Sequence, residues 1–398
     1  MRILIPNATS PKNTGDQALL ESLLTLIHKT IPVADIRIHS VDPILQKKLL
    51  SGVEIESSLL SWLMFEKPKF TDRAVRSFQA MLGILFPLLI SNNKLKAILR
   101  DYKKSDAIIF VGNGYFRSTK GLTQSVLLLL QLVPFTLAKL SRKPVIVGPI
   151  SFGPFAHHWQ EKLAASVLSG TSMLFVREEI SLDLARKQKL AHARLGADLA
   201  LLLPHQTQSK NEKSYIGVSL RNWYAPRAQK RLEHAVITAL ISFAKQTGET
   251  IKLFVNVDAP EHKDIDMTVA TRVYTALARA NIPVEKPQIL NTYQVAMKEY
   301  QTCSLLLGMR MHANILAATQ YVPFVGIAYE HKTMGIAKTL GMQSYCIWGH
   351  DVTTERLLLL LQTAYTNRAQ IRKDLIKALT SIQDFNESLW ANTLTKIS

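Results

Sequence analysis

Residues 305–318 read Leu-Leu-Leu-Gly-Met-Arg-Met-His-Ala-Asn-Ile-Leu-Ala-Ala, and this stretch predicts the architecture of the chain. Its apolar start, without polar alternation, is typical of a parallel strand buried on both faces. The strand is predicted to end at Gly308, and a helix is predicted to begin near His312. Arg310 and His312 therefore stand at a strand-to-helix junction. Both can reach one ligand at the helix N-terminus, where backbone N–H groups favour anions.

The same alternation of strand and helix extends along the chain in both directions. Short runs rich in Ile, Val and Leu predict strands at 2–6, 36–40, 107–111, 144–148, 173–176, 215–220, 251–255, 305–308, 324–328 and 344–347. Helical stretches are predicted between them at 16–29, 158–168, 228–246 and 265–280. This pattern favours an α/β fold with two doubly wound, Rossmann-like domains facing a cleft.

Residues 204–214 carry almost nothing apolar and predict a linker, after which a second strand series starts. We therefore expect an N-terminal α/β domain over 1–205 and a C-terminal α/β domain over 206–352. The tail, 353–398, is predicted to be helical and to pack back on the first domain.

Composition narrows the class of protein. The chain has 398 residues, of which 47% are hydrophobic and 20% charged, so it can bury sizeable cores and is not a disordered chain. Two cysteines, Cys303 and Cys346, make no disulfide framework, and no Cys/His spacing is typical of zinc. The start of the chain lacks a signal-peptide core, and no window reaches the ~18 consecutive apolar residues of a spanning helix. These features predict a cytoplasmic protein.

The formal net charge of +18 predicts anionic partners. Residues 67–104 contain nine Lys/Arg against two acids and enclose the apolar run 81–90. We expect this segment, with 125–140, to form a basic and apolar surface that rests on an anionic membrane, at the inner face of the plasma membrane. Two solvated core helices are the open alternative. Nucleic acid is excluded as the favoured partner, because it calls for basic residues interleaved with aromatics.

Ligands of doubly wound sheets bind beyond the carboxyl ends of the strands, so polar strand ends are candidate sites. Asn13-Thr-Gly-Asp16 follows the first strand; Asp16 could cap a helix or accept a proton from a substrate hydroxyl. Gly112 and Gly114 follow a later strand and permit close backbone approach, although a plain turn explains them equally well.

Cationic residues follow four further strands. Arg177 can bind an anion or form an internal ion pair with its acidic neighbours, which is the favoured interpretation. Arg221 has no acidic neighbour in sequence, so an anionic ligand is more plausible there. Lys332, beside His331, is predicted to reach the same ligand as Arg310 and His312. The second domain is thus predicted to bind a small, multiply charged anion and to offer it a proton.

The ordered set of motifs resembles the polysaccharide pyruvyl transferase family over roughly residues 3–342. The matching residues are Asn13/Gly15/Asp16/Ala18, Gly112/Gly114, Gly148/Pro149, Arg177/Glu178/Ser181, Arg221, Arg310/His312/Ala313 and Tyr329/Glu330/Lys332. The Arg-x-His junction is the most specific of them. The resemblance implies a fold like that of the two-domain (GT-B-like) glycosyltransferases.

The resemblance also implies the reaction. Such enzymes use phosphoenolpyruvate to place a pyruvate ketal across two sugar hydroxyls and release phosphate, with no other cofactor and no metal. His312 would then protonate C3 of phosphoenolpyruvate, and Asp16, from the opposite domain, would activate the sugar hydroxyl. The expected substrate-binding residues are Arg221, Arg310, Lys332, Asn13, Gly15, Gly114, Arg177 and His331. The expected acceptor is a saccharide of a cell-surface polysaccharide or of its lipid-linked precursor.

A glycosyltransferase that uses a nucleotide sugar is the alternative function. Its diphosphate would also need Arg and Lys at a helix N-terminus. Binding of phosphoenolpyruvate against a panel of nucleotide sugars separates the two.

Overall fold

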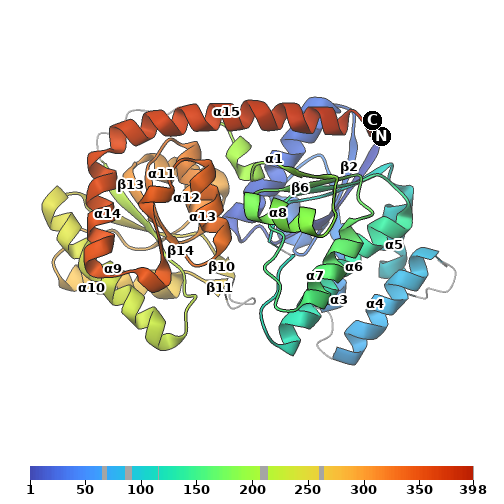
Figure 1. The fold of residues 1–398 in the computed structure, drawn as a ribbon, viewed down its shortest axis with the longest axis horizontal. Coiled ribbons are helices and arrows are strands. Elements are labelled where there is room, and N and C mark those ends of the chain that lie inside the picture. Colours follow the sequence, from blue (N-terminus) through green and yellow to red (C-terminus); the bar gives the residue numbers. More distant parts are fainter. Residues whose placement is uncertain (65–69, 86–91, 115, 207–213, 260–263, 398) are drawn as a thin grey trace. The chain divides into compact units, whose positions relative to one another are not determined.

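The computed structural model describes residues 1–64, 70–85, 92–114, 116–206, 214–259 and 264–397. It forms two compact units (Figure 1). Unit 1 consists of Met1–Pro11, Leu19–Leu199 and Asn386–Ser398, and unit 2 of Lys12–Ala18 and Ala200–Phe385. Most of the linker predicted at 204–214 lies outside the described residues.

Unit 1 is built on a parallel sheet of seven strands in the order β3-β2-β1-β4-β5-β6-β7. The strands are β1 (Arg2–Ala8), β2 (Asp35–Ser40), β3 (Glu54–Ser57), β4 (Ala107–Phe110), β5 (Val145–Ile150), β6 (Met173–Val176) and β7 (Ala193–Leu195). The helices are α1 (Thr14–Thr30), which starts in unit 2, α2 (Pro43–Leu49), α3 (Leu59–Met64), α4 (Phe70–Leu85), α5 (Asn93–Lys104), α6 (Leu122–Ser141), α7 (His158–Leu168) and α8 (Glu179–Lys187).

Unit 2 repeats this plan with six parallel strands in the order β12-β9-β8-β13-β14-β15. The strands are β8 (Tyr215–Ser219), β9 (Thr250–Val255), β12 (Gln288–Ile289), β13 (Cys303–Gly308), β14 (Phe324–Ala328) and β15 (Cys346–Trp348), with a small hairpin of β10 (Asp258–Ala259) and β11 (Asp264–Ile265). The helices are α9 (Pro226–Thr247), α10 (Met267–Arg279), α11 (Tyr293–Gln301), α12 (Met311–Thr319), α13 (His331–Thr339), α14 (Thr354–Thr366) and α15 (Arg368–Leu394). Helix α15 begins in unit 2, and its residues from Asn386 onward belong to unit 1.

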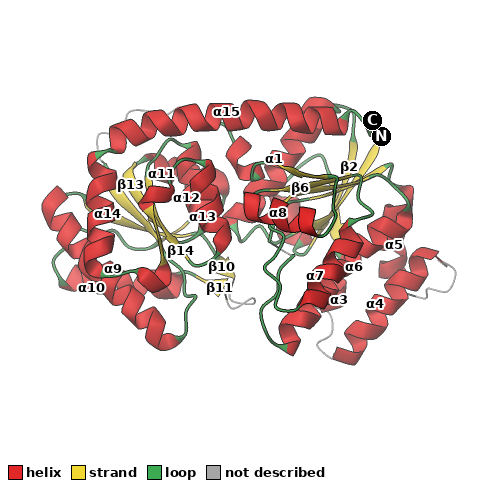
Figure 2. Ribbon diagram, viewed as in Figure 1, coloured by secondary structure: helices red, strands yellow, loops and turns green. Residues whose placement is uncertain are grey.

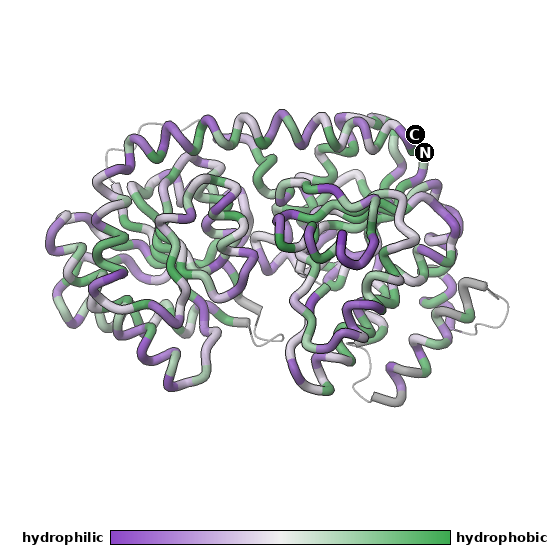
Figure 3. The backbone as a smooth tube through the Cα atoms, viewed as in Figure 1, coloured by the Kyte–Doolittle hydropathy of each residue, from purple (hydrophilic) through white to green (hydrophobic). Residues whose placement is uncertain are grey.

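The predicted α/β class is confirmed in both units (Figure 2). All ten predicted strands and all four predicted helices are present, with ends shifted by a few residues. The strands missed were β3, β7 and β12, at sheet edges, and the β10–β11 hairpin. Edge strands are short and partly exposed, so they need no continuous apolar run. Figure 3 shows the matching pattern, with hydrophobic residues along the inner strands and hydrophilic ones on outer helix faces.

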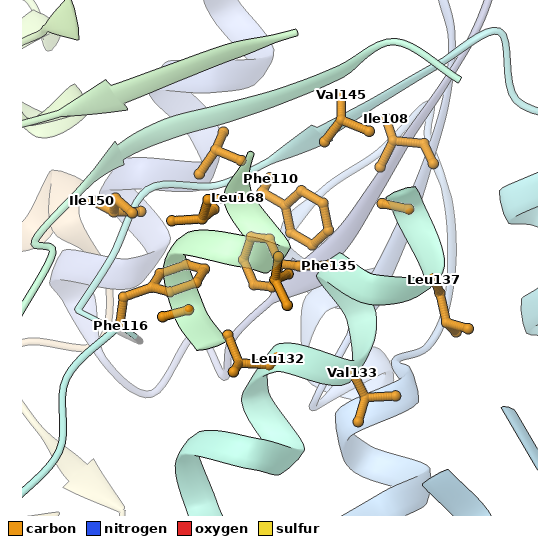
Figure 4. Packing of buried hydrophobic residues seen from close by; sticks show 14 of the residues in the cluster. Ile108, Phe110, Phe116, Leu132, Val133, Phe135, Leu137, Val145, Ile150 and Leu168 are labelled. Carbon is orange, nitrogen blue, oxygen red and sulfur yellow. The ribbon is translucent and has the colours of Figure 1, made fainter. Parts of the chain in front are cut away.

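The core of unit 1 lies between its sheet and helix α6 (Figure 4). Phe135 of α6 stacks on Phe110 at 3.8 Å between ring centroids and meets the edge of Phe116 at 4.7 Å. This helix is the one described helix long and apolar enough to cross a membrane by length and composition. Its buried residues include Leu128, Leu132, Phe135 and Leu137. The run 125–140 therefore contributes to the core, as the alternative interpretation held, and the predicted membrane surface keeps only α4 and α5.

The C-terminal end of α15 packs within unit 1. The rings of Trp390 and Phe175 lie 4.9 Å apart, and the Asn386 side chain accepts a hydrogen bond of 2.7 Å from the Ala197 backbone. The side chains of Trp390 and Asn386 are both buried. Residues far apart in sequence thus complete one core.

Candidate active site

The strand order of unit 2 reverses between β8 and β13, which is where doubly wound sheets bind their ligands. In the register of this sheet, Gly308 pairs with Ser219 on one side and with Gly326 on the other. Because the strands are parallel, the segments after β8, β13 and β14 all leave from the same edge. Those segments carry Arg221, Arg310 with His312, and 329–332 respectively.

Arg221 lies between two aromatic rings. Its guanidinium carbon is 4.6 Å from the ring centroid of Trp223 and 5.0 Å from that of Tyr329. Its Nη1 donates a hydrogen bond of 2.9 Å to the Tyr329 hydroxyl. The Gln229 side chain accepts hydrogen bonds from the backbone N–H groups of Trp223 and Tyr224, which secures this segment on α9. The guanidinium is therefore held in one orientation by cation–π contacts and a hydrogen bond.

Arg310 is the N-cap residue of α12 and is only 8% exposed. Its Nη2 donates to Asp266 at 2.6 Å, and its Nε donates to the same carboxylate at 3.0 Å. Asp266 also accepts a hydrogen bond from the Val257 backbone at 3.2 Å. A two-point contact of this kind orients the guanidinium plane. Sequence analysis missed Asp266, because it stands 44 residues before Arg310 and no local spacing joins the two.

The segment Lys12–Ala18 packs as part of unit 2, although it follows β1 of unit 1. Asn13 forms a β-bridge with Val257, and the Thr14 backbone donates to the Asn256 carbonyl at 3.5 Å. A Cβ placed on Gly15 would lie 2.1 Å from Nδ1 of His312, so the imidazole rests directly against this glycine. Only glycine permits that approach.

This packing corrects one expectation about Asp16. Sequence analysis placed Asp16 in the domain opposite His312, whereas its segment belongs to the same unit. The Asn13 side chain donates to Asp16 at 3.1 Å and accepts from the Gly15 backbone at 3.1 Å. Asp16 lies in the first turn of α1, and this paired asparagine fixes its carboxylate. Asn13, Gly15, Asp16 and His312 thus form one continuous part of unit 2.

The pKa of Tyr329 reflects the positive charges of the site. Burial tends to raise its pKa, but the positive charges of Lys332, Arg221 and Arg310, with the Arg221 hydrogen bond, hold the pKa of Tyr329 below its ordinary value. The three cations predicted from separate strand ends therefore act on one phenol. Lys332 also forms an ion pair with Glu330 at 2.9 Å. His331 starts α13, where its exposed ring meets the edge of Trp348 at 5.4 Å.

Arg177 and Gly114 belong to unit 1, whereas the other predicted site residues belong to unit 2. The Arg177 side chain is 1% exposed and donates to Asp198 at 2.8 Å and to Ser151 at 2.9 Å. The internal ion pair favoured from the sequence is thus present, with Asp198 as its nearest acid and Glu178 farther away at 3.5 Å. Gly114 follows β4, one of the two strands between which the order of the first sheet reverses.

Close backbone packing accounts for the neighbouring glycines of unit 1. A Cβ on Gly112 would lie 2.2 Å from the Pro149 carbonyl oxygen, and one on Gly148 would lie 2.7 Å from the Gly112 nitrogen. These glycines let the ends of β4 and β5 approach each other. Within the described residues, no three His, Cys, Asp or Glu side chains gather as metal ligands would.

Comparisons with known proteins agree with this geometry. Over its full length the chain is 22% identical to the amylovoran biosynthesis protein AmsJ of Erwinia amylovora, across 100% of both chains. Among solved structures it resembles Anabaena Alr3699/HepE in complex with UDP-glucose, with a TM-score of 0.60, 13% identity and coverage of 100% and 98%. It also resembles a glycosyltransferase from Rickettsia africae ESF-5, with a TM-score of 0.58, 12% identity and coverage of 100% and 99%.

These structural neighbours show the fold, which is the GT-B-like fold expected from the sequence. The family comparison goes further, because the polysaccharide pyruvyl transferase pattern matches residues 13–331. That range begins at Asn13 and ends at His331, so it includes Arg221, Arg310 and His312, and Lys332 follows it directly. The chain belongs to the polysaccharide pyruvyl transferase family.

Proposed function

We propose that the protein transfers the pyruvyl group of phosphoenolpyruvate to two hydroxyls of a sugar, forming a ketal and releasing inorganic phosphate. The acceptor is a saccharide of a cell-surface polysaccharide or its lipid-linked precursor. The observation that carries this proposal is the gathering of Arg221, Arg310 and Lys332 around Tyr329, beside His312. A carboxylate and a phosphate on one small molecule need several cations at close range.

The proposed reaction assigns one task to each group. A sugar hydroxyl adds to C2 of phosphoenolpyruvate while His312 delivers a proton to C3, which becomes the methyl group. Phosphate leaves C2, which gains oxocarbenium character, and the second hydroxyl closes the ketal. Asp16 takes the proton of an attacking hydroxyl. Proton transfer by a placed side chain contributes ~10²–10⁴-fold, so loss of His312 should lower turnover by about that factor.

Phosphate release from phosphoenolpyruvate with lipid-linked saccharides tests the proposal, with mass spectrometry of the product for an added pyruvyl unit. We expect His312→Gln to lose turnover and largely keep phosphoenolpyruvate affinity, since glutamine keeps a hydrogen bond but supplies no proton. Turnover within about threefold of wild type would remove His312 as the acid. His331, in the adjacent segment, would be tested next.

A substitution at Arg221 tests the proposed anion site separately from catalysis. We expect Arg221→Ala to lower phosphoenolpyruvate affinity about ten- to a hundredfold, because a charge-assisted contact contributes roughly 1.5–3 kcal/mol. Isothermal titration measures this directly. Unchanged affinity would take Arg221 out of the site.

A glycosyltransferase that uses a nucleotide sugar is the second candidate. The resemblance to a protein solved in complex with UDP-glucose favours testing it. Titration with a panel of nucleotide sugars distinguishes the candidates, because a pyruvyl transferase of this kind binds phosphoenolpyruvate instead. The proposed place of action is the cytoplasmic face of the plasma membrane, where a lipid-linked saccharide presents its sugar.

A further inference from the structure

Tyr329 is the one ionisable group at the centre of the described site that the proposed reaction does not use. It follows β14 directly, and its hydroxyl accepts a hydrogen bond of 2.9 Å from Nη1 of Arg221. Its ring lies 4.7 Å from that of Trp223, so the two rings enclose the guanidinium. The phenol therefore helps to set the position of the Arg221 guanidinium.

The hydrogen of this phenol points to a second role. Arg221, Arg310 and Lys332 are the charges that act on Tyr329, and all three can only donate hydrogen bonds. None of them can accept the phenolic hydrogen. An anion bound among the three cations would bring an acceptor oxygen to the place where they converge.

The acids of the neighbourhood are engaged elsewhere. Glu330 forms an ion pair with Lys332 at 2.9 Å, and Asp266 binds Arg310 at 2.6 Å. Burial and Tyr329 together raise the pKa of Tyr224, a second phenol. Among the described residues, the charged groups that act on Tyr329 are thus all cations.

We propose that Tyr329 is a further anion-binding residue, which holds Arg221 in place and donates its own hydrogen to a carboxylate or phosphate oxygen of phosphoenolpyruvate. The identity of that ligand rests on the proposed function. The arrangement of Tyr329 among three cations is independent of the proposed function, and inorganic phosphate serves as a second probe of this arrangement.

Binding of the anion should depend on pH. Tyr329 donates only as the neutral phenol, whereas the phenolate would itself neutralise the cations and repel the ligand. The depressed pKa places this change below the ordinary tyrosine value of about 10. Affinity for the anion should therefore fall as pH rises toward that range. Binding of the anion should in turn return a proton to Tyr329.

The experiment compares wild type with Tyr329→Phe, which keeps the ring and removes the hydroxyl. Tyr215→Phe is the matched control, because it makes the same change at the opposite end of β8. Titration calorimetry with phosphoenolpyruvate and with inorganic phosphate, from about pH 7 to 9.5, gives affinity against pH. Ultraviolet absorbance of tyrosinate follows the phenol during the same titrations.

We expect Tyr329→Phe to bind both probes about tenfold more weakly near pH 7 and to lose the alkaline fall of wild type. Added anion should lower the tyrosinate absorbance of wild type and of Tyr215→Phe, and leave that of Tyr329→Phe unchanged. Affinities within twofold of wild type, with the same pH profile, would overturn the inference, as would a wild type that binds neither probe. Tyr329-dependent binding of phosphate without binding of phosphoenolpyruvate would overturn only the proposed donor.

Discussion

Gly15 links two motifs that lie almost 300 residues apart in the chain, because its missing side chain makes room for the His312 ring. Local sequence suggests only a flexible turn at this glycine. The structure instead makes it a spacing element, against which the proposed acid is positioned. Small displacements of such a group are costly, since about 1 Å can lower a rate by ~10²-fold.

Gly15→Ala tests this spacing. The added methyl group would overlap Nδ1 of His312, so either the imidazole or the segment Lys12–Ala18 must move. We expect phosphate release to fall about tenfold or more, with a smaller change in phosphoenolpyruvate affinity. Gly196→Ala is the control, because its Cβ would meet its nearest neighbour at an ordinary 3.4 Å. Turnover of Gly15→Ala within twofold of wild type would contradict the assignment.

The buried pair of Arg310 and Asp266 changes what a substitution at Arg310 will do. A strand-end cation that only binds ligand could be replaced by alanine without unfolding the protein. The structure shows a side chain that also neutralises Asp266, which is 0% exposed. Removing one partner of a buried pair leaves an uncompensated charge and costs about 3–5 kcal/mol.

We therefore expect Arg310→Ala to lower the free energy of unfolding by about that amount, measured in urea. The double variant Arg310→Ala/Asp266→Asn should be more stable than Arg310→Ala alone, since it no longer buries an unpaired charge. Arg221→Ala serves as the comparison, because Arg221 contacts the rings of Trp223 and Tyr329 and its loss should affect ligand binding far more than stability. If the two arginine variants unfold alike, Asp266 does not depend on Arg310.

Helix α5 of unit 1 has a buried apolar face and an exposed basic face. Leu95, Ile98, Leu99 and Tyr102 are buried, whereas Lys96, Arg100, Lys103 and Lys104 are exposed at helical spacing on the opposite face. On the neighbouring α4, Val75 and Phe78 are 54% and 58% exposed. Lys67, Lys69 and residues 86–90 of the predicted membrane surface lie outside the described residues.

The membrane prediction can be tested on α5 alone. Each basic residue near an anionic surface contributes about 1 kcal/mol, so glutamine at Lys94, Lys96, Arg100, Lys103 and Lys104 should weaken binding to anionic vesicles strongly. Co-sedimentation at low and high salt measures it, with neutral vesicles as the control. Activity on a short, water-soluble acceptor should stay nearly intact. Wild-type binding that is absent, or indifferent to lipid charge and salt, would rule the surface out.

Asp101 anchors the same helix to β2, and this anchor is sensitive to acid. Burial raises the pKa of Asp101, but the hydrogen bond and charge of His39 and the charge of Arg37 outweigh it and lower the pKa overall. The His39 contact measures 2.9 Å. Because the folded-state pKa is depressed, the stabilisation is present above the ordinary value of about 3.9 and is lost as pH falls through the lower folded value.

We expect Asp101→Asn to lower the free energy of unfolding at neutral pH and to flatten its decline between about pH 5 and 2. Chemical denaturation across this range measures both effects. Asp374→Asn, an exposed change on α15, should leave the curve unchanged. A variant that declines with acid as steeply as wild type would show that other carboxylates control the acid limb.

At the scale of the whole molecule, the residues proposed to bind the anion lie within unit 2, which includes a short segment from the start of the chain. Ligand binding stabilises the state that binds it, by about 2.7 kcal/mol at a hundred times the dissociation constant. The effect should be local to the elements that carry the site.

Hydrogen exchange with and without phosphoenolpyruvate maps this effect. We expect slower exchange in Lys12–Ala18 and at the carboxyl ends of β8, β13 and β14, and little change in the sheet of unit 1. The titration with inorganic phosphate is the control for a non-specific anion effect. Protection centred on Gly112 and Gly114 instead would move the anion site to unit 1.

The inner strands, several of the helices and the strand ends that carry cations could be predicted from the sequence, as the stretch 305–318 illustrates. Burial on both faces selects continuous apolar runs, and amphipathic periodicity selects helices, so both leave local signals. The edge strand β12 left none, because a two-residue strand at a sheet edge needs little apolar sequence.

Which charges form ion pairs, and which distant segments contact each other, depends on the tertiary structure. Arg310 pairs with Asp266, 44 residues away in the sequence, and Arg177 pairs with Asp198, 21 residues away. The segment Lys12–Ala18 joined unit 2 through contacts with Asn256, Val257 and His312. The roles of these residues in catalysis stay predictions, but their proximity does not follow from any local pattern. A residue's local sequence encodes whether it is buried, whereas its partner depends on how the strands are ordered, and that order is a property of the folded chain.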